Sequence, residues 1–480
     1  MKSKIIFAVL ITSAILFSAC NSNDNVTPET TQENETITSV SEKESDDNKD
    51  TEAAVTKIEN EKSESNITEL TFNKSAQIEE TVLYDENDVK ITATGLVYTD
   101  SEVNLKLLIE NNSNTGLSFI SGSMGYSCNS VNGYMIDDGY MNCDVAEGKK
   151  ANGVISFDYS ELFIHGITEI ADIEVGIEIE DDDDNRIYTG PMQVKTPLAD
   201  TYEYDDLKFQ NAITSDALIN KLQYDILYFN PEKAYDDLGI SIGSEFVIER
   251  NEKTLLLFEV TNNTDEDFYV KTSNIFVNGL KVESGTWSFD YVNPGKKCIV
   301  SIDVLRTVDE VCQTAFNIKE IGDISLDVGF VNDDVQDIAS PTKLSIDIPD
   351  RDFPFDSTGE EVYNSNGLRI VSKGIFNDDS KYSDDNHIIL LFENNSQNNM
   401  IIDDEFNSMS VNGFMTDYSF YSVKLKAGEN AVSDIRLWGF GLEEIPVSNV
   451  SEITDVEFMI SIKDDYGSIA EDEVISISNS

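Results

Sequence analysis

The chain has 480 residues, of which 91 are acidic and 33 basic, and its formal net charge is −58. This charge argues against nucleic acid or anionic lipid as a partner, because both are bound through lysine and arginine. The only two histidines, His165 and His387, lie in different parts of the chain. Nucleophilic catalysis most often relies on a histidine base, so we expect no enzyme, no catalytic residue and no cofactor.

The first twenty residues, MKSKIIFAVLITSAILFSAC, combine two lysines, an apolar stretch and a small-residue site that ends at Cys20. This pattern predicts an export signal over residues 1–20, too short for a spanning helix. It resembles the signal of bacterial lipoproteins, although Phe17 stands where leucine is usual. The resemblance implies a lipid on Cys20 and a place on the extracellular side of the cell membrane. The alternative is an ordinary cleaved signal with an incidental cysteine.

Residues 21–78 are rich in Asn, Ser, Thr and acidic side chains. Such a composition buries too little apolar surface to offset the entropy of ordering, so we predict a disordered acidic linker. A coil of about 58 residues spans on the order of 40 Å. The linker would therefore hold the folded part away from the membrane.

From residue 79 onward the chain repeats one pattern three times. Each copy has an apolar run that ends in paired asparagines, then Val-Asn-Gly, then Gly-Lys or Gly-Glu, then Ile-x-Asp followed by Ile or Val. An internal repeat of this kind decides the architecture before any side-chain chemistry is considered. The paired asparagines end at 112, 263 and 395, Val-Asn-Gly lies at 131–133, 277–279 and 411–413, the glycine of the third marker is at 148, 295 and 428, and the last marker lies at 170–173, 321–324 and 453–456.

The stretches between these markers alternate apolar and polar residues, which is typical of strands with one buried face. Asn-Gly between extended stretches is the strongest short-range signal of a hairpin. We predict an all-β protein with three tandem immunoglobulin-like antiparallel β-sandwiches, over residues 79–199, 232–350 and 351–480. The markers resemble the immunoglobulin-like repeats of secreted and lipid-anchored proteins of Gram-positive bacteria, many of them of uncharacterised function. That resemblance implies a fold and no activity.

One segment, residues 200–231, does not follow the repeat. In it Ser215-Asp216 precedes Leu218, Leu222, Ile226 and Phe229 at near-helical spacing, and Asn230-Pro231 ends the run. We predict a helical or irregular connector packed against a neighbouring sandwich. The alternative is a docking element, residues 202–231, for a partner in an envelope complex.

Four cysteines follow Cys20, in two local pairs. Cys128 and Cys143 lie in the first repeat, and Cys298 and Cys312 in the second. Local pairs in an exported chain predict two disulfides within the repeats. The third repeat has no cysteine, so these bonds would be supplementary to the fold. No CxxC or Cys/His spacing indicates redox chemistry or zinc binding.

Carboxylates are so numerous that their proximity in sequence carries little information, and a carboxylate-dependent hydrolase is the least favoured function. The acidic turn at 181–185 lacks the ligand spacing of a calcium loop, so we expect a solvated hairpin tip and no metal.

Aromatic residues around the Val-Asn-Gly hairpins are the candidate binding surface, because aromatic side chains are enriched at interfaces. They would equally serve a sandwich core, since strand alternation turns half of them inward. We interpret the chain as a non-catalytic surface lipoprotein, a spacer or a binding module for a protein or glycan ligand. A purely structural stalk, an accessory subunit and a hydrolase are the alternatives. The candidate binding residues are Tyr134, Tyr140, Phe414 and Tyr418.

Overall fold

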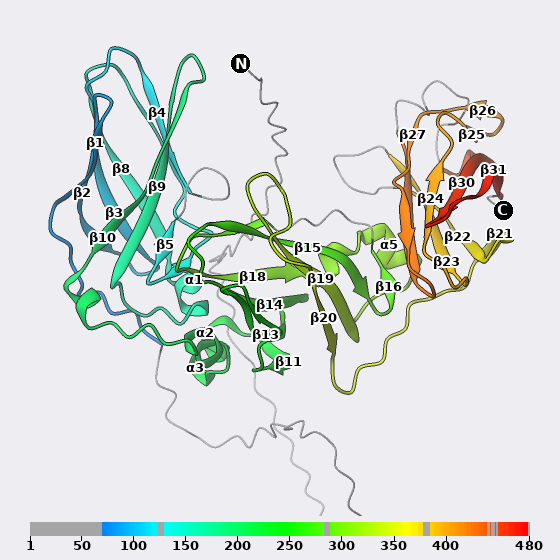
Figure 1. Cartoon of the computed structure of the whole chain (residues 1–480), viewed down its shortest axis with the longest axis horizontal. Helices are drawn as coiled ribbons and strands as arrows, with labels where there is room; N and C mark the ends of the chain where they lie inside the picture. Colours follow the sequence, from blue (N-terminus) through cyan, green and yellow to red (C-terminus); the bar gives the residue numbers. More distant parts are fainter. Residues whose placement is uncertain are drawn as a thin grey trace, which may run out of the picture. The chain divides into compact units, whose positions relative to one another are not determined.

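The computed structural model describes residues 70–122, 129–282, 289–377, 385–438, 442, 447 and 450–478, all of them within one compact unit, Asn66–Ser480. These residues form antiparallel sheets with few helical turns (Figure 1), and the prediction of an all-β sandwich architecture is confirmed. The export signal with Cys20, the linker up to residue 69, and Cys128 lie outside the described residues.

The first repeat folds into two layers of strands. One sheet has the order β1-β2-β3-β8, and the other has the order β6-β5-β9-β4-β7 with β10 on β9. The elements are β1 (Thr81–Glu86), β2 (Val89–Tyr98), β3 (Glu102–Asn111), β4 (Leu117–Ser121), β5 (Ser130–Val131), β6 (Tyr134–Met135), β7 (Met141–Val145), β8 (Lys150–Asp158), α1 (Tyr159–Ile164), β9 (Asp172–Asp181), β10 (Arg186–Lys195) and η1 (Pro197–Asp200).

The second and third repeats use the same plan. The second contains β12 (Tyr235–Asp237), β13 (Ile240–Arg250), β14 (Lys253–Asn262), β15 (Phe268–Val277), β16 (Leu280–Lys281), β17 (Phe289–Val292), β18 (Lys297–Asp303), α4 (Val304–Thr307), α5 (Glu310–Ala315), β19 (Asp323–Val331) and β20 (Thr342–Asp347). The third contains β21 (Glu360–Ser365), β22 (Leu368–Asn377), β23 (Asn386–Asn394), β24 (Met400–Asp404), β25 (Ser410–Val411), β26 (Phe414–Met415), β27 (Tyr418–Ser419), β28 (Val423–Leu425), β29 (Asn430–Leu437), η2 (Val450–Glu452), β30 (Asp455–Asp464) and β31 (Gly467–Ser478).

Each Val-Asn-Gly forms the predicted hairpin turn. Asn132, Asn278 and Asn412 have φ of 49°, 53° and 51°, and the glycines that follow have φ of 86°, 78° and 78°. Positive φ at both positions is what a type I′ turn requires, and Asn-Gly adopts it readily. The asparagine side chain also joins the turn to the last marker. The Oδ1 atom of each accepts a hydrogen bond from the residue before the marker aspartate, at 2.8 Å in every repeat.

The first asparagine of each pair connects the two sheets of its sandwich. In the second repeat Asn262, at the end of β14, is fully buried and donates from Nδ2 to the Val292 carbonyl at 2.8 Å. Because β14 and β17 belong to opposite sheets, this bond crosses the core. Asn111 makes the same bond to the Val145 carbonyl, and Asn394 bonds Lys426 just after β28.

The end of the predicted linker is folded. Phe72 is buried, and its ring stacks on Tyr159 with centroids 4.3 Å apart. The backbone N–H of Asn73 also donates to the Thr168 carbonyl at 2.7 Å. The prediction of disorder is therefore wrong for residues 70–78, because Phe72 packs against the first sandwich.

The connector holds two short helices, α2 (Lys208–Ile213) and α3 (Asp216–Leu222), and the strand β11 (Asp225–Asn230). The helix α3 begins where the sequence predicted, directly after Ser215, and the Ser215 side chain caps it by accepting from the Leu218 N–H. The helix ends sooner than predicted, however, since Gln223 adopts the left-handed conformation and Ile226 and Phe229 lie on β11. Strand β11 pairs with β13 of the second repeat.

Candidate functional site: the Asn-Gly hairpins and the junctions they form

Each repeat has one Asn-Gly hairpin (residues 130–135, 276–281 and 410–415), and the first two hairpins are where neighbouring repeats meet. In the first, β6 pairs in parallel with β18 of the second repeat, Tyr134 opposite Lys297. In the second, β16 pairs in parallel with β29 of the third repeat, Leu280 opposite Asn430. The register is the same in both junctions. In both, the residue that follows Asn-Gly lies opposite the residue two places after the glycine of the Gly-Lys or Gly-Glu marker, which is Gly295 or Gly428.

This pairing joins sheets across repeats. The second sheet of the first repeat continues into the first sheet of the second repeat, giving an 11-stranded sheet. The second sheet of the second repeat continues in the same way into the third repeat, giving a 10-stranded sheet. Two sheets remain at the ends of the series: the four strands β1-β2-β3-β8 and the six strands around β30.

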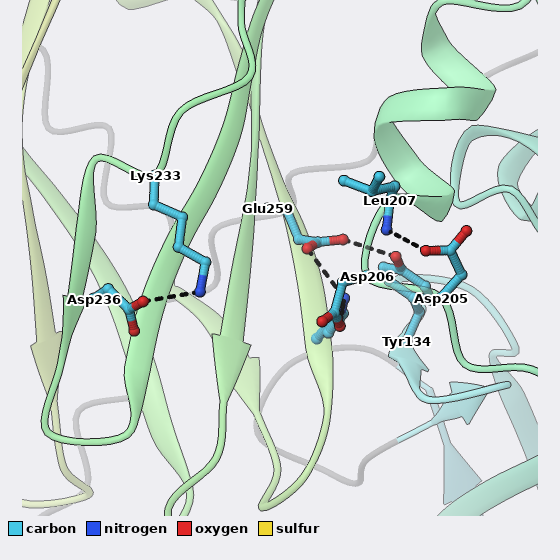
Figure 2. A network of polar contacts seen from close by, with 8 residues as sticks. Tyr134, Asp205, Asp206, Leu207, Lys233, Asp236 and Glu259 are labelled. Carbon is cyan, nitrogen blue, oxygen red and sulfur yellow. Dashed lines mark hydrogen bonds and ion pairs between the residues drawn. The ribbon is translucent and has the colours of Figure 1, made fainter.

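The first junction contains a polar network (Figure 2), in which Tyr134 and Glu259 are buried and Asp206 is exposed. Tyr134 donates from its hydroxyl to Glu259 Oε2 at 2.7 Å, and Lys297 Nζ lies 3.3 Å from Glu259 Oε1 and 3.0 Å from Asp206 Oδ1. Burial raises the pKa of Glu259, and the nearby Lys297 and Tyr134 act against that rise. A second ion pair, Lys296 Nζ to Glu174 Oε1 at 2.7 Å, lies across the same junction.

The second junction is apolar at the corresponding places. Leu280 is fully buried, and it belongs to a core cluster that includes Leu391 and Val432 of the third repeat. Lys281 turns its Nζ toward the Lys424 carbonyl, 2.7 Å away. The two junctions thus share a backbone register and differ in side-chain chemistry.

Among the described residues, no strand of another repeat covers the hairpin of the third repeat. Its second arm, β26, pairs only with β25 among the described residues. Phe414 is 48% exposed and Met415 63% exposed, whereas Tyr134 at the place of Phe414 is 3% exposed. The Asn-Gly hairpin is therefore covered by the next repeat in the first two repeats and exposed in the third.

The four candidate binding residues divide accordingly. Phe414 and Tyr140 are exposed, as a binding surface requires. The prediction is wrong for Tyr134, which is buried in the first junction. Tyr418 is half-buried, and its hydroxyl donates to Asp404 Oδ2 at 2.7 Å, so it serves the third sandwich.

The second cysteine pair is not joined. Cys298 and Cys312 are buried free thiols, one at the start of β18 and the other on α5. The predicted bond between them is therefore absent from the structure. Cys143 on β7 has a free thiol and Cys128 lies outside the described residues, so the first bond stays a prediction for the oxidised protein.

A small cleft of about 70 Å³ lies beside Tyr134, lined in part by Asp137, Glu161, His165 and Asp290. Burial raises the pKa of Glu161 to about 8 and that of Asp137 to about 6, and lowers the pKa of His165 to about 4. At neutral pH Glu161 is therefore protonated and His165 uncharged. The cleft has room for a few water molecules and not for a sugar unit.

These shifts predict how Glu161→Gln behaves with pH. The unfolded carboxyl ionises near 4.5 and the folded one near 8, so the wild type is fully stabilised below about pH 4.5 and loses stability as the pH rises towards 8. The glutamine variant lacks this loss. Relative to the wild type it should gain up to about 1.4 kcal/mol per pH unit between pH 5 and 8, measured by urea unfolding.

Charged groups near Glu161, namely Asp137, Asp138, Asp158 and His165, remain in both proteins, so their own titration largely cancels in the difference. Glu147→Gln, at an exposed site, should show a flat difference. A flat difference for Glu161→Gln as well would contradict the raised pKa.

In the described ranges, no three His, Cys, Asp or Glu side chains are grouped so that they could hold a metal ion. The acidic turn is held together internally, as Asp181 Oδ1 accepts from the N–H groups of Asp183 and Asn185 at 2.9 and 3.0 Å. None of the helices in the described part of the chain has the length and apolar character needed to cross a membrane.

No protein-family model and no curated protein matches this chain. Solved structures similar to it include red sea bream transglutaminase, with 10% identity and a TM-score of 0.14 over 56% of this chain and 32% of that one. The exo-chitosanase CsxA of Amycolatopsis orientalis has 6% identity and a TM-score of 0.17, over 84% and 79%. A Corynebacterium diphtheriae protein described as membrane-anchored has 9% identity and a TM-score of 0.14, over 84% and 94%.

The match spans about a third of the length of the transglutaminase. At these TM-scores and identities the similarities carry no argument about activity, ligand or location.

Proposed function

We propose that this protein is a non-catalytic cell-surface module, anchored by a lipid on Cys20, which displays three sandwiches and presents the hairpin of the last one to a ligand. One observation carries the proposal. The Asn-Gly hairpin is covered by the next repeat in the first two repeats and open in the third, where Phe414 and Met415 are exposed.

The junctions support a spacer role. Each pair of neighbouring repeats shares a continuous sheet, and buried side chains of the later repeat join the core of the earlier one. Shared hydrogen bonds and a shared core resist separation of neighbouring sandwiches. Together with an N-terminal lipid and an acidic linker, this arrangement suits a chain that carries its last repeat away from the membrane.

The open hairpin supports a binding role. Residues 410–415, SVNGFM, contain no charged side chain in a chain of net charge −58. An exposed phenylalanine and an exposed methionine on a sheet edge are suited to pairing with an extended segment of another molecule, because the edge supplies backbone hydrogen bonds and the side chains supply apolar contact.

The accessory-subunit alternative receives less support. The apolar side chains of the connector, among them Phe209, Ile213 and Leu218, are buried against this chain's own first two repeats. A partner docking there would meet mainly polar residues. The carboxylate-hydrolase alternative is not favoured either, since the cleft that gathers acidic groups is too small for a glycan.

Surface labelling of intact cells tests the proposal. A membrane-impermeant maleimide should label Met415→Cys, because this position is exposed on the last repeat. It should leave Lys281→Cys unlabelled, since that residue occupies the same hairpin position in the second repeat and is only 8% exposed. The wild type gives the background from the native thiols, and expression is kept low so that copies stay apart.

The anchor is tested in the same cells. The Cys20→Ala chain should no longer fractionate with the membrane, because it has lost the site of acylation. A Cys20→Ala chain that stays with the membrane contradicts the lipid anchor. If the maleimide labels neither Met415→Cys nor Lys281→Cys on intact cells, the protein is not displayed at the surface.

A further inference from the structure

Among the described residues, each end of the series has one strand edge of the kind that an internal junction covers, and both edges are open there. Strand β26 has a strand neighbour on one side only within the described residues, at the edge of the last sheet. Strand β8, at the edge of the first sheet, pairs only with β3 in the part of the chain that the structure describes. At each internal junction a hairpin strand, β6 or β16, pairs with an edge strand of the next repeat, β18 or β29. Strand β26 occupies the place of the hairpin strands, and strand β8 occupies the place of the edge strands.

The correspondence holds at single residues. Lys150 on β8 lies opposite Glu110 on β3. In the later repeats the corresponding pairs are Lys297 on β18 with Thr261 on β14, and Asn430 on β29 with Glu393 on β23. Lys150 therefore occupies the place of Lys297 and Asn430, the residues that meet the incoming hairpins. Phe414 occupies the place of Tyr134 and Leu280 on the hairpin side.

Side chains at the contact positions match in each case. Tyr134 meets Glu259 through a hydrogen bond, and Leu280 shares an apolar cluster with Leu391, which occupies the place of Glu259. On the first repeat that place belongs to Leu108, which is half-buried. Phe414, which has no hydroxyl, would thus face Leu108. An apolar contact would take the place of the hydrogen bond between Tyr134 and Glu259.

A charge pair follows the same rule. Glu174 and Lys296 form an ion pair at the first junction. The second junction has Ser325 and Glu429 in those places, so no ion pair can form between them. At the ends of the series the places belong to Glu457 and Lys149, and the pair is present again. Both side chains are exposed.

From this match we infer that the open hairpin of the last repeat docks on the edge of strand β8 in a second copy of this chain, with Phe414 opposite Lys150 and Glu457 beside Lys149 of that copy. The inference rests on the proposed function and names the partner of the displayed hairpin. The contact joins different surfaces of the two copies, so it does not close and copies can add head to tail.

Two features make this contact weaker than the internal junctions. The outward positions of β3 include Asn104 and Lys106, where β14 has Leu255 and Leu257, so less apolar surface is covered. Each copy also carries a net charge of −58 and repels the next. Salt screens such repulsion, with a Debye length of about 10 Å at 0.1 M, so association should strengthen as salt is added.

Sedimentation velocity on residues 21–480, which lack the lipid-bearing Cys20, over a range of protein and salt concentrations tests the inference. We expect species beyond the dimer that grow with protein concentration. Phe414→Ser, Lys149→Glu and Glu457→Lys should each weaken association roughly tenfold. The double variant Lys149→Glu/Glu457→Lys should restore it, because the ion pair is re-formed with its charges exchanged. Lys343→Glu, the same charge change at an exposed place on β20, should leave association close to that of the wild type.

Mixing two end-blocked variants gives a sharper result. The Lys149→Glu chain keeps its hairpin and the Phe414→Ser chain keeps its β8 edge, so the mixture should form dimers that cannot grow. Thermal melting checks that each variant is folded. The inference is overturned if the wild type stays monomeric at high protein and salt concentration, if association stops at a dimer, or if Phe414→Ser associates like the wild type. If the chain sediments as a monomer and Met415→Cys is nevertheless labelled on intact cells, this inference alone is overturned and the proposed function stands.

Discussion

Replacing Lys297 with methionine should lower the free energy of unfolding by about 3 kcal/mol. The reason lies in Glu259, which is almost fully buried at the first junction and has Lys297 as its cation, 3.3 Å away. Removing one partner of a buried ion pair leaves the other charge without compensation, and the cost is that of a desolvated carboxylate. The Tyr134 hydroxyl remains as a donor to Glu259 and is not sufficient to replace a charge. Urea unfolding followed by circular dichroism measures the change.

The chain supplies its own control. Lys150 occupies the place of Lys297 in the first repeat and pairs with Glu110, but its side chain is exposed. Exposed ion pairs contribute at most about 1 kcal/mol, so Lys150→Met should have a small effect. Equal effects of the two substitutions would mean that the first junction does not exclude water from Glu259.

The second junction also suggests a rescue. It has Leu280, Leu391 and Asn430 at the places of Tyr134, Glu259 and Lys297. A chain with Glu259→Leu, Lys297→Asn and Tyr134→Phe should therefore recover much of the lost stability, since no buried charge remains. This would show that the polar network confers the choice of neighbour more than the strength of the contact.

The elements that the sequence predicts well are those decided by local chemistry. Asn-Gly turns, the Ser215 cap and the strand alternation each depend on a few adjacent residues, and each appears in the structure. The junctions depend instead on which face of a strand meets the next repeat, and alternation alone cannot separate a face that meets solvent from one that meets a neighbouring sandwich. Tyr134 was for that reason assigned to a surface.

One signal for the junctions is nevertheless present in the sequence. Outward positions of the strand before the paired asparagines are Asn104 and Lys106 in the first repeat, Leu255 and Leu257 in the second. Apolar side chains at these two positions of the second repeat, where the first repeat has polar ones, indicate a strand face that is covered by a neighbouring repeat. The short helices α1, α4 and α5 had no such signal beyond the capping aspartates Asp158, Asp303 and Asp309.

Substituting Asn262 with alanine should cost about 3 kcal/mol, although the change removes only a small polar side chain. Its Nδ2 donates to the carbonyls of Glu266 and Val292, at 2.9 and 2.8 Å, and its Oδ1 accepts from the Thr264 N–H and hydroxyl. Alanine would remove the side-chain donor to the Val292 carbonyl inside the sandwich, and a buried backbone group that loses its partner costs about 1–3 kcal/mol. The neighbouring Asn263 is exposed, so Asn263→Ala should change stability by less than about 0.5 kcal/mol.

Asn262→Asp separates the loss of a donor from the loss of volume. An ionised carboxylate of the same size would face two carbonyl oxygens, so at neutral pH this variant should be less stable than Asn262→Ala. Burial raises the pKa of such a group, and its protonated form can donate one hydrogen bond again, so stability should return as the pH falls. An aspartate variant whose stability does not depend on pH would mean that Asn262 acts by filling space. The same result at Asn111 and Asn394 would then remove the physical reason for an asparagine in every repeat, because the bond between the two sheets would carry no free energy.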